Sequence, residues 1–398
     1  MRILVVSQFF PPEPGAAQNR LGAFVSGLLD RGHTVTVICE QPNHPAGVFQ
    51  PGFGRRPIVV ERSGALTVRR LWVAASPRRT LVRRAAFYGS FAVGALAAVP
   101  AAGRHDVLLV SSPPLPPAVA AATAAWLRRL PLVLDVRDIW SIAIQAVDVH
   151  GRGRLLAATE RYERILFGSA ARITATTRAF CEHIDRVVGR PIAEYLPNGA
   201  SDALLALPDQ PRPDGGPLVV GYAGNFGLLH RLDVVLEAAV LLRSEDVRFL
   251  LVGDGPRGDD LRRERERRGL DAVELRPSVP ADRLGALLMG CDVLLSPLGP
   301  APALEAVIPS KTYDAMAVGR PVITSARGEA AALVTQNGCG LVVEPDDPAA
   351  LAAAIRRLAA DRALARRLGA AGRAAAAAHA RSRQIERLEA VLRAAARL

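Results

Sequence analysis

The chain has 398 residues, of which 50% are hydrophobic and 22% are charged, so it is long enough for two globular domains with full cores. Its formal net charge of +12 suits nucleic acid, an anionic membrane surface or phosphorylated substrates. No zinc-finger, helix-turn-helix or RNP pattern is present and aromatic residues make up only 5%, so we expect no nucleic-acid partner.

The cysteines and the N-terminal residues indicate a cytoplasmic protein. Cys39, Cys181, Cys291 and Cys339 lie far apart and form no C-x-x-C pair, which is typical of buried thiols in a reducing compartment. Residues 1–7 lack the long apolar region of a signal peptide, so we do not expect export.

The first half of the chain begins as a β–loop–α–β unit. Residues 3–6 form an apolar run of the buried-strand type, residues 17–30 have a helix pattern, and residues 34–38 make the next strand. This predicts a βαβ unit of the Rossmann type, with the loop 11–15 at the sheet edge where ligands bind; a plain connection is the alternative. We expect the rest of a doubly wound parallel sheet from strands at 107–110, 132–136 and 172–175 and helices at 116–129 and 153–168.

An alanine-rich apolar segment at 85–102 follows two arginine pairs, Arg78-Arg79 and Arg83-Arg84. It is barely long enough to span a bilayer and holds two glycines before Pro100, so a transmembrane helix is rejected. Two interpretations stay open: a core helix of the first domain, or a helix that lies on an anionic membrane.

Polar residues follow the strand 132–136, where the sheet is expected to open. Arg137 and Asp138 stand at this strand end, either as part of a site or as a structural Asp–Arg pair. The stretch 41–57 is a long irregular loop, and such loops in compact domains are commonly functional or mobile.

The segment 208–217 is the best linker in the chain, and after it the same architecture starts again. We therefore expect a first Rossmann-like domain at 1–207, a second at 218–375, and a helix at 376–398 that packs back across the domains. The second domain is predicted to contain strands at 218–224, 249–253, 273–276 and 293–295 and helices at 232–242, 259–269 and 282–289.

The stretch 309–323 carries the strongest sign of chemistry. Ser310 is a good N-cap and Gly319 suits the left-handed position after a short helix. Lys311 is the only lysine of the chain and stands in the first helical turn, where the macrodipole disfavours a cation. A helix N-terminus beside a lysine predicts a phosphate site. Lys311 and Asp314 share a helix face, so a surface ion pair worth about 0.2–0.5 kcal/mol is the alternative.

Several common motifs are absent from the sequence. It has no Walker A, H-E-x-x-H or G-x-S-x-G, and the loop after the first strand lacks the G-x-G-x-x-G of dinucleotide binding, so an NAD enzyme and other standard chemistries have little support. There is also no D-x-D to hold a metal ion against a diphosphate, so we expect neither a cofactor nor a required metal.

The motifs together resemble the retaining GT-B glycosyltransferases of the group 1 family over nearly the whole chain. The residues that carry the resemblance are the loop after the first strand, 31–37, Pro197-Asn198-Gly199, Gly253-Asp254-Gly255-Pro256, and 314–317 through 319–323. Within the family, Pro42-Asn43-His44-Pro45, 136–140 and 309–311 resemble the branch that transfers N-acetylated hexosamines or deoxyhexosamines in bacterial surface-polysaccharide assembly. The resemblance implies two Rossmann-like domains that face a cleft, the first binding the acceptor and the second the nucleotide sugar.

The resemblance also implies roles for individual residues. Asp314 would hold the nucleotide ribose, Ser310 and Lys311 would lie near the diphosphate or sugar, and Gly15-Ala16 would approach the diphosphate from the first domain. Arg137 and Asp138 would flank the transferred sugar, which makes them catalytic candidates with Lys311. The remaining donor-binding candidates are Gly224, Asn225, His230, Arg231, Gly253, Pro309, Thr312 and Tyr313.

The sequence departs from the family pattern at several of these positions. The family has two glutamates eight apart; here the second is Asp314 and the first falls on Ala306, with Glu305 beside it. The Arg and Lys common after the first glycine turn of the second domain are Asn225 and His230, with Arg231 adjacent. Neutralisation of the diphosphate is therefore expected to rest more heavily on Lys311, with Arg231 as a second candidate.

The expected function is transfer of a sugar from a nucleoside diphosphate sugar, with a UDP-linked N-acetylated sugar favoured, to a polysaccharide or lipid-linked acceptor. Peripheral contact with the anionic inner face of the plasma membrane follows from the basic apolar region. Retention by front-face attack is favoured, because only Asp138 is a candidate nucleophile for double displacement. A nucleotide-sugar epimerase and a non-catalytic partner subunit with the same fold are the alternatives.

Overall fold

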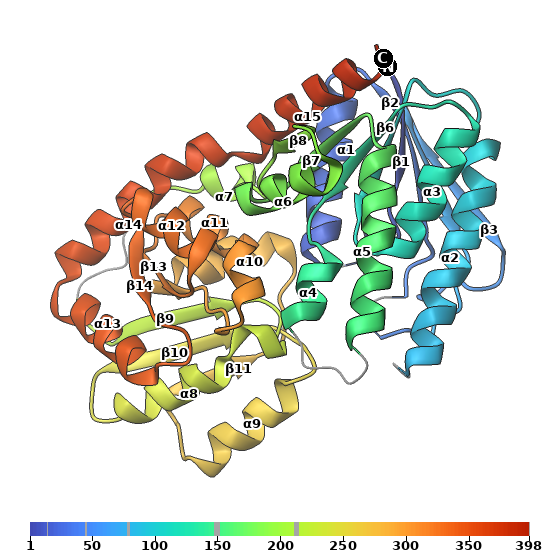
Figure 1. Ribbon diagram of the computed structural model, residues 1–398. Helices are drawn as coiled ribbons and strands as arrows, with labels where there is room; N and C mark the ends of the chain where they lie inside the picture. Colours follow the sequence, from blue (N-terminus) through green and yellow to red (C-terminus); the bar gives the residue numbers. More distant parts are fainter. Residues whose placement is uncertain (14, 44–45, 78–79, 147–151, 211–214, 398) are drawn as a thin grey trace. The chain divides into compact units, whose positions relative to one another are not determined.

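The computed structural model describes residues 1–13, 15–43, 46–77, 80–146, 152–210 and 215–397, which form two compact units (Figure 1). Unit 1 comprises Met1–Pro197 and Ser382–Leu398, and unit 2 comprises Asn198–Arg381. The predicted boundary at 208–217 is therefore placed too late, because the chain enters unit 2 at Asn198, and residues 211–214 lie outside the described part. Helix α7 (Asp202–Leu205) already packs in unit 2, where Leu204 joins a buried cluster.

Unit 1 is built on an eight-stranded sheet in the order β3-β4-β2-β1-β5-β6-β7-β8. Its strands are β1 (Arg2–Val6), β2 (Thr34–Glu40), β3 (Ile58–Ser63), β4 (Leu66–Leu71), β5 (Val107–Ser112), β6 (Leu132–Val136), β7 (Arg172–Ala175) and β8 (Ala193–Tyr195). All neighbours are parallel except β3 and β4, which form an antiparallel hairpin around Gly64. The predicted doubly wound parallel sheet is thus confirmed, and the antiparallel hairpin is an unpredicted addition at its edge.

Helices cover both faces of this sheet, and Figure 1 shows α2, α3 and α5 side by side. The helices of unit 1 are α1 (Ala16–Asp30), α2 (Leu81–Ala101), α3 (Leu115–Leu127), α4 (Trp140–Ala146), α5 (Arg152–Ser169), α6 (Arg178–Val188) and α15 (Arg381–Ala395). Their ends follow local chemistry: the Thr177 hydroxyl accepts from the Phe180 N–H at the start of α6, and Gly189 ends that helix in the left-handed region.

The core of unit 1 follows from side-chain alternation along its strands. Ile3 and Val5 of β1 pack into one cluster with residues of α1 and α15, such as Leu28 and Leu388. Leu4 lies between Ile3 and Val5 and is equally buried, so it points to the opposite face of the sheet. Strands buried on both faces explain the continuous apolar runs of the sequence.

A buried ion pair also lies inside unit 1. The Arg20 guanidinium of α1 meets the Asp135 carboxylate of β6 at 2.8 Å, and both side chains are almost fully buried. Arg20 also donates to the carbonyls of Leu196 and Pro197, and the Thr174 hydroxyl donates to Asp135. The pair therefore ties α1, β6, β7 and the end of the first chain segment together.

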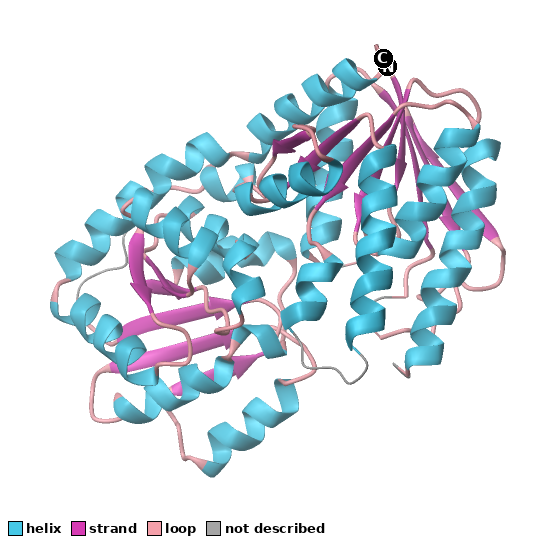
Figure 2. Cartoon of the chain, in the orientation of Figure 1, coloured by secondary structure: helices cyan, strands magenta, loops and turns pink. Residues whose placement is uncertain are grey.

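Unit 2 is built on a six-stranded parallel sheet in the order β11-β10-β9-β12-β13-β14 (Figure 2, strands in magenta). Its strands are β9 (Leu218–Ala223), β10 (Val247–Val252), β11 (Val273–Arg276), β12 (Val293–Leu295), β13 (Val322–Ser325) and β14 (Gly340–Val343). Its other helices are η1 (Leu228–His230), α8 (Leu232–Leu241), α9 (Gly258–Arg267), α10 (Ala281–Met289), η2 (Pro302–Ala306), α11 (Ser310–Ala317), α12 (Gly328–Gln336), α13 (Pro348–Ala360), α14 (Arg362–Ala376) and η3 (Ala377–His379).

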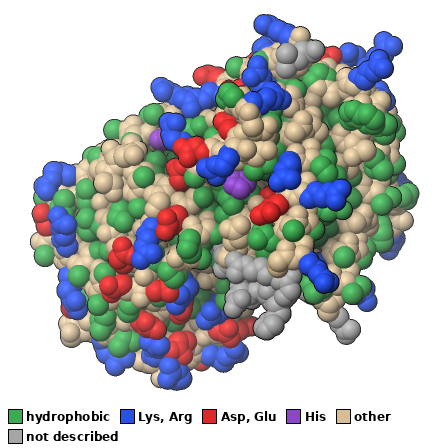
Figure 3. Space-filling model, viewed as in Figure 1, with side chains coloured by type: hydrophobic (Ala, Val, Ile, Leu, Met, Phe, Trp, Pro, Cys, Tyr) green, Lys and Arg blue, Asp and Glu red, His purple; other side chains and the backbone are tan. Residues whose placement is uncertain are grey.

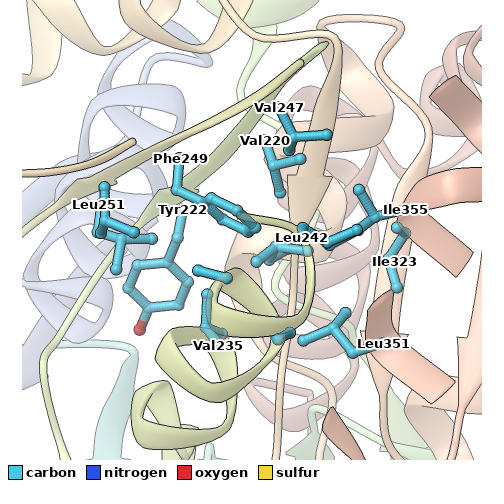
Figure 4. Close-up of a cluster of buried hydrophobic side chains, with 14 of the residues drawn as sticks. Val220, Tyr222, Val235, Leu242, Val247, Phe249, Leu251, Ile323, Leu351 and Ile355 are labelled. Atoms are coloured by element: carbon cyan, nitrogen blue, oxygen red, sulfur yellow. The ribbon is translucent and has the colours of Figure 1, made fainter. Parts of the chain in front are cut away.

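The core of unit 2 centres on β9 and β10, where Tyr222, Phe249 and Leu251 pack against Val235 of α8 and Ile355 of α13 (Figure 4). Tyr222 is buried in this apolar cluster although its hydroxyl is polar. That hydroxyl reaches the sheet edge and donates to the Asn225 carbonyl at 2.7 Å.

The segment predicted at 85–102 is a helix, α2, that begins four residues earlier at Leu81. Within the part of the chain that the structure describes, no helix combines the length and apolar character needed to cross a bilayer.

We predict that Arg20→Ala lowers the free energy of unfolding by about 3–5 kcal/mol, because it leaves the Asp135 carboxylate buried without its cation. The matched control is Arg2→Ala, which breaks the exposed pair of Arg2 with Asp106 and should cost less than about 1 kcal/mol. Urea unfolding, fitted with a transition for each unit, measures both effects. Equal losses in the two variants would contradict a special role for the buried pair.

Candidate functional site

The carboxyl edge of the unit 2 sheet is shaped by two glycine turns. β9 ends at Ala223 and is followed by Gly224, and β10 ends at Val252 and is followed by Gly253. A Cβ atom on Gly253 would lie 1.8 Å from the Gly224 carbonyl oxygen, so no larger residue fits there. A Cβ atom on Gly224 would lie 3.2 Å from Nζ of Lys311. The glycines thus let backbone and the lysine amine approach the same point.

Lys311 reaches this point from α11. The helix begins at Ser310 with Pro309 as its N-cap, and no side chain caps its first N–H groups. The prediction of Ser310 as N-cap is therefore one residue too late. Gly319 adopts a left-handed φ of 68° after the helix, as predicted. The first turn of α11 thus combines free backbone donors with a lysine.

The Lys311 amine has polar and aromatic neighbours but no carboxylate partner. Nζ donates to the Tyr222 hydroxyl at 3.0 Å, lies 3.3 Å from Nδ1 of His230, and stands 4.4 Å from the centroid of the Tyr222 ring. Nδ1 of His230 also lies 3.3 Å from the Pro297 carbonyl, so it accepts from Lys311 in one tautomer and donates to Pro297 in the other.

The environment of the amine changes the charges of the site. Burial lowers the pKa of Lys311 to about 7, although Asp314 favours the charged form. Burial, with the nearby Lys311, lowers the pKa of His230 to about 4, so this imidazole is neutral at pH 7. The site therefore holds one titratable cation that an incoming anion would stabilise.

Asp314 lies one turn further along α11. Burial raises the pKa of its carboxyl to about 6, opposed by the charges of Arg381 and Lys311. No ion pair within 4 Å joins Lys311 to Asp314 among the described residues, so the alternative of a surface ion pair is not observed. Both groups are left for other partners.

Two predicted donor-binding side chains of α11 point into the interior instead. Thr312 is fully buried and its hydroxyl lies 2.7 Å from that of Ser296. Tyr313 is also fully buried, with its ring 5.4 Å from the His379 ring. This corrects the prediction for these two side chains, because a helix of eight residues buries one of its faces.

The residues after the first glycine turn supply less charge than the sequence suggests. The Arg231 guanidinium is engaged by Asp233 at 3.0 Å and by Asp346, so its charge is already compensated. Asn225 is exposed and neutral. Glu305 is exposed on η2, where it borders a hollow with Leu298 and Arg327, and Ala306 offers no polar group. Among the described residues considered for this site, Lys311 is therefore the cation that has no carboxylate partner.

Unit 1 contains a separate cavity of about 310 Å³ at the carboxyl edge of its own sheet. It is lined by the predicted residues Gly15, Ala16 and Arg137, and by Phe9, Ala17, Gln18, Tyr88, Pro113, Pro114 and Trp140. The start of α1 has no side-chain cap and no acidic residue in its first turn. The structure thus brings the predicted loop of unit 1 and Arg137 to one cavity.

Arg137 and Asp138 are held by different partners. Nε of Arg137 donates to the Ser111 hydroxyl at 2.8 Å and Nη2 donates to the Pro113 carbonyl at 2.6 Å. Burial lowers the pKa of this guanidinium to about 10. Oδ1 of Asp138 accepts from the Ile139 N–H at 2.9 Å, and burial raises the pKa of the carboxyl. The alternative of a mutual Asp–Arg pair is therefore not observed.

Sequence reasoning missed the aromatic members of both sites. Tyr222 is hidden inside an apolar strand, and its role follows only from its position at the strand end. Tyr88 and Trp140 come from α2 and α4, with rings 6.0 Å apart, so only the fold brings them together. Of the motif Pro42-Asn43-His44-Pro45, residues 44–45 lie outside the described part, and so does the pair Arg78-Arg79.

In the described part of the chain, no group of three His, Cys, Asp or Glu side chains is arranged to hold a metal ion. The four cysteines form no disulfide; Cys39, Cys291 and Cys339 are buried and Cys181 is half-buried.

Comparison with known protein families gives two adjacent matches. The model described as "Glycosyl transferase 4-like domain" matches residues 15–199, and the one described as "Glycosyl transferases group 1" matches residues 217–361. The chain is also 29% identical over 384 residues to WcaI of Escherichia coli, named as a colanic acid biosynthesis glycosyl transferase, with 90% of this chain and 92% of that protein covered. It is 31% identical over 193 residues to a D-inositol 3-phosphate glycosyltransferase of Streptomyces avermitilis, covering 46% of this chain and 38% of that protein.

Solved structures share the fold over the full chain. Sucrose-phosphate synthase from Thermosynechococcus elongatus superposes with a TM-score of 0.75 at 19% identity, covering 99% of both chains. HepE of Anabaena in complex with UDP and glucose gives a TM-score of 0.71 at 17% identity, covering 99% of this chain and 100% of that chain. WaaG, a glycosyltransferase involved in lipopolysaccharide biosynthesis, gives 0.68 at 16% identity, covering 98% and 99%.

We predict that the Lys311 amine titrates with a midpoint near pH 7, because it is buried without a carboxylate partner. Reductive methylation with ¹³C-formaldehyde labels only this amine and the N-terminal amine, since the chain has one lysine. NMR titration of the labelled chain gives the midpoint, and Lys311→Arg identifies the N-terminal signal. A lysine midpoint near the ordinary value of about 10.4 would contradict the site as described.

Proposed function

We propose that this chain, which belongs to the group 1 glycosyltransferases and has the GT-B fold, transfers an N-acetylated sugar from its UDP-linked form to a polysaccharide or lipid-linked acceptor, with retention at the anomeric carbon. The observation that carries the proposal is the Lys311 amine, which stands at the carboxyl edge of the unit 2 sheet without a carboxylate partner. The WcaI relative, named for colanic acid biosynthesis, supports a polysaccharide acceptor, and the UDP complex of HepE, which shares the fold, supports a UDP donor.

The chemistry of the donor explains why such an amine is useful. When the glycosidic bond to the diphosphate breaks, negative charge develops on the departing oxygen. A preorganised cation and free backbone N–H groups stabilise that charge where it forms. Lys311 and the uncapped start of α11 would supply such a cation and such N–H groups. Asp314, one turn away, would accept from the ribose hydroxyls of the nucleotide.

Two routes to retention are distinguished by the carboxylates of unit 1. A double displacement needs an ionised carboxylate that attacks the anomeric carbon. Asp138 is the candidate, but burial raises the pKa of its carboxyl and its Oδ1 already accepts a backbone hydrogen bond. We therefore favour front-face attack, in which the departing phosphate takes the proton of the acceptor hydroxyl. Arg137, which lines the unit 1 cavity, is proposed to contact the transferred sugar or the acceptor.

The proposed donor class is tested with a panel of UDP-, GDP- and dTDP-linked sugars, each with and without a lipid-linked acceptor. Transfer of UDP-linked N-acetylated sugars, with the α linkage of the donor kept in the product, is the expected result. Turnover without any acceptor would support the epimerase alternative, and no turnover with any donor would support the partner-subunit alternative.

We predict that Lys311→Ala lowers kcat for sugar transfer by about 10²–10³-fold, the usual effect of removing one preorganised donor from a developing negative charge. Lys311→Arg should restore part of the rate. The matched control is Arg356→Ala, which removes a unit 2 cation already paired with Glu245 at 2.7 Å and should leave the rate unchanged. A rate like that of the unaltered chain for Lys311→Ala would overturn the assignment.

Loss of folding is separated from loss of catalysis by Lys311→Met. Burial lowers the pKa of Lys311 in the folded state, so its charge opposes folding fully below pH 7, and this penalty decreases as pH rises from 7 toward the unfolded-state pKa of about 10.4. Lys311→Met should therefore raise the free energy of unfolding at pH 6, on the order of 2 kcal/mol, while the enzyme stays inactive.

Affinity for UDP-N-acetylglucosamine is predicted to fall as pH rises above about 7. The free enzyme then holds a neutral Lys311, so binding of the anionic donor must take up a proton, and the affinity falls up to about tenfold per pH unit. Neither phosphate of this donor titrates in the range, because both are diesterified. Calorimetry in two buffers of different ionisation enthalpy measures the proton uptake, and Lys311→Met should abolish it.

A further inference from the structure

We propose that the outer face of α2, together with the C-terminal end of α3, binds an anionic lipid membrane, and that α2 thereby brings a lipid-linked acceptor to the unit 1 cavity. The membrane contact is inferred only from the surface properties of unit 1 and does not depend on the proposed function. The delivery of an acceptor rests on the proposed function.

One face of α2 is exposed and carries no charge. Val82, Ala86, Val93, Leu96 and Ala97 recur at helical spacing and are all exposed, Val82 by 78% and Val93 by 72%. The opposite face packs into unit 1 through residues such as Phe91 and Ala95. These residues span 82–97, so the helix presents an apolar stripe about 22 Å long. Isolated exposed apolar side chains are ordinary, but a continuous stripe indicates an interaction surface.

The end of α3 extends this apolar surface. Trp126 is 75% exposed and Leu127 is 64% exposed. Nη1 of Arg128, the next residue, donates to the Pro100 carbonyl at the end of α2, and its Nη2 donates to Gly103 at 3.1 Å. The C-terminal ends of α2 and α3 therefore lie close together. Tryptophan suits a membrane interface, because its ring is apolar and its N–H can stay hydrated. We call this surface the α2–α3 face.

Arginines stand at both ends of the α2–α3 face. Residues 81–129 contain five arginines, two at the start of α2 and three near the ends of α2 and α3, which are Arg83, Arg84, Arg104, Arg128 and Arg129. The one acidic residue of this segment, Asp106, is paired with Arg2. Figure 3 shows hydrophobic side chains with Lys and Arg side chains near them over the region where Figure 1 draws α2 and α3.

This charge distribution selects a lipid surface over a protein. Arg83 and Arg84 lie in the first turn of α2, where the helix macrodipole disfavours cations, so anionic headgroups would relieve an unfavourable arrangement. A second copy of the chain would place arginines against arginines in a two-fold contact. An apolar helix face bordered by arginines is the form of a helix that lies in a membrane interface.

α2 also connects this surface to the unit 1 cavity. Tyr88, on the half-buried side of the helix, lines the cavity, with its ring 6.0 Å from that of Trp140. The neighbouring Phe87 ring lies 6.5 Å from that of Phe9, which also lines the cavity. One helix thus offers its outer face to lipid and an aromatic side chain to the cavity.

The test is flotation of the full chain with two kinds of vesicle, phosphatidylcholine alone and phosphatidylcholine mixed with phosphatidylglycerol. Binding only to the mixed vesicles is expected, and it should weaken in 1 M salt, where charges are screened within about 3 Å. Arg83→Ala/Arg84→Ala should lower the partition coefficient by about 30-fold, because each arginine near an anionic surface contributes about fivefold. Val82→Glu/Val93→Glu should abolish vesicle binding. Both positions are exposed, so these substitutions should not affect folding.

Matched controls carry the same changes elsewhere. Leu241→Glu places a carboxylate at an exposed apolar position of unit 2, and Arg262→Ala/Arg263→Ala removes two neighbouring arginines from exposed positions of α9. Both should float like the unaltered chain. Equal losses in the controls would show that binding follows net charge alone and would overturn the α2–α3 face.

Trp126 reports contact at this face directly. Its fluorescence should shift to the blue when mixed vesicles are added, and Trp126→Phe should remove most of that shift while flotation persists. Absence of vesicle binding, combined with a dimer in light scattering that Val82→Glu/Val93→Glu dissociates, would overturn the proposal in favour of a second copy.

Failure of this proposal is distinguishable from failure of the proposed function. Lys311→Ala should float like the unaltered chain, because the α2–α3 face contains no part of unit 2. Val82→Glu/Val93→Glu should keep transfer to a short-chain, water-soluble acceptor and lose transfer to an acceptor embedded in mixed vesicles. Loss of both transfers would count against the separate membrane surface.

Discussion

The Lys311 amine lies where its positive charge is disfavoured, both by the macrodipole at the helix start and by burial. A hydroxyl, an imidazole and an aromatic ring surround it. Every nearby feature of unit 2 sustains this arrangement. The glycine turns after β9 and β10 leave room for it, Tyr222 provides an oxygen from a strand that is otherwise apolar, and Arg231 is occupied by carboxylates of its own. A glycosyltransferase must stabilise the negative charge that develops on the departing diphosphate. A cation that no carboxylate neutralises before the donor binds is suited to this task.

In unit 1, the buried arginine of the core is paired with a carboxylate, unlike Lys311 in unit 2. Arg20 is matched in its interior by Asp135 and by two backbone carbonyls, so it serves the architecture. Arg137 stands at the edge of the same sheet, is held by neutral oxygens, and faces a cavity with aromatic walls. The two arginines thus differ in what they can still bind, because Arg20 is accompanied by a carboxylate and Arg137 is not.

The sequence was sufficient for the parts of the fold that depend on local pattern. Apolar runs located most strands to within two residues, and β6, β7, β11 and β12 to the residue. Most of these strands are buried on both faces and therefore leave an uninterrupted apolar signal. The β3–β4 hairpin was missed, since its strands lie at the sheet edge and carry arginines and a glutamate between their apolar residues. The unit boundary was misplaced, because composition marks the exposed proline-rich segment whereas packing places the division at Asn198.

For the site, the anomaly of a single lysine in a helix start was visible in the sequence, and so was the shared face of Lys311 and Asp314. The direction of each side chain could not be predicted from the sequence. Thr312 and Tyr313 stand between Lys311 and Asp314 on the same helix, and tertiary packing decides which side of that helix is buried. The compensation of Arg231 by Asp346 joins residues 115 positions apart, and no local pattern reports such a pair.

The last helix of the chain has a consequence for the order in which the protein forms. α15 belongs to unit 1, where Leu388 and Leu392 complete the cluster that includes Leu21 and Leu28, yet it is translated after all of unit 2. A growing chain can therefore finish the interior of unit 2 while the unit 1 cluster still lacks the apolar side chains of α15. Until α15 is available, α1 exposes apolar residues to any chaperone or neighbouring chain, and the first domain to be synthesised is the second to be finished.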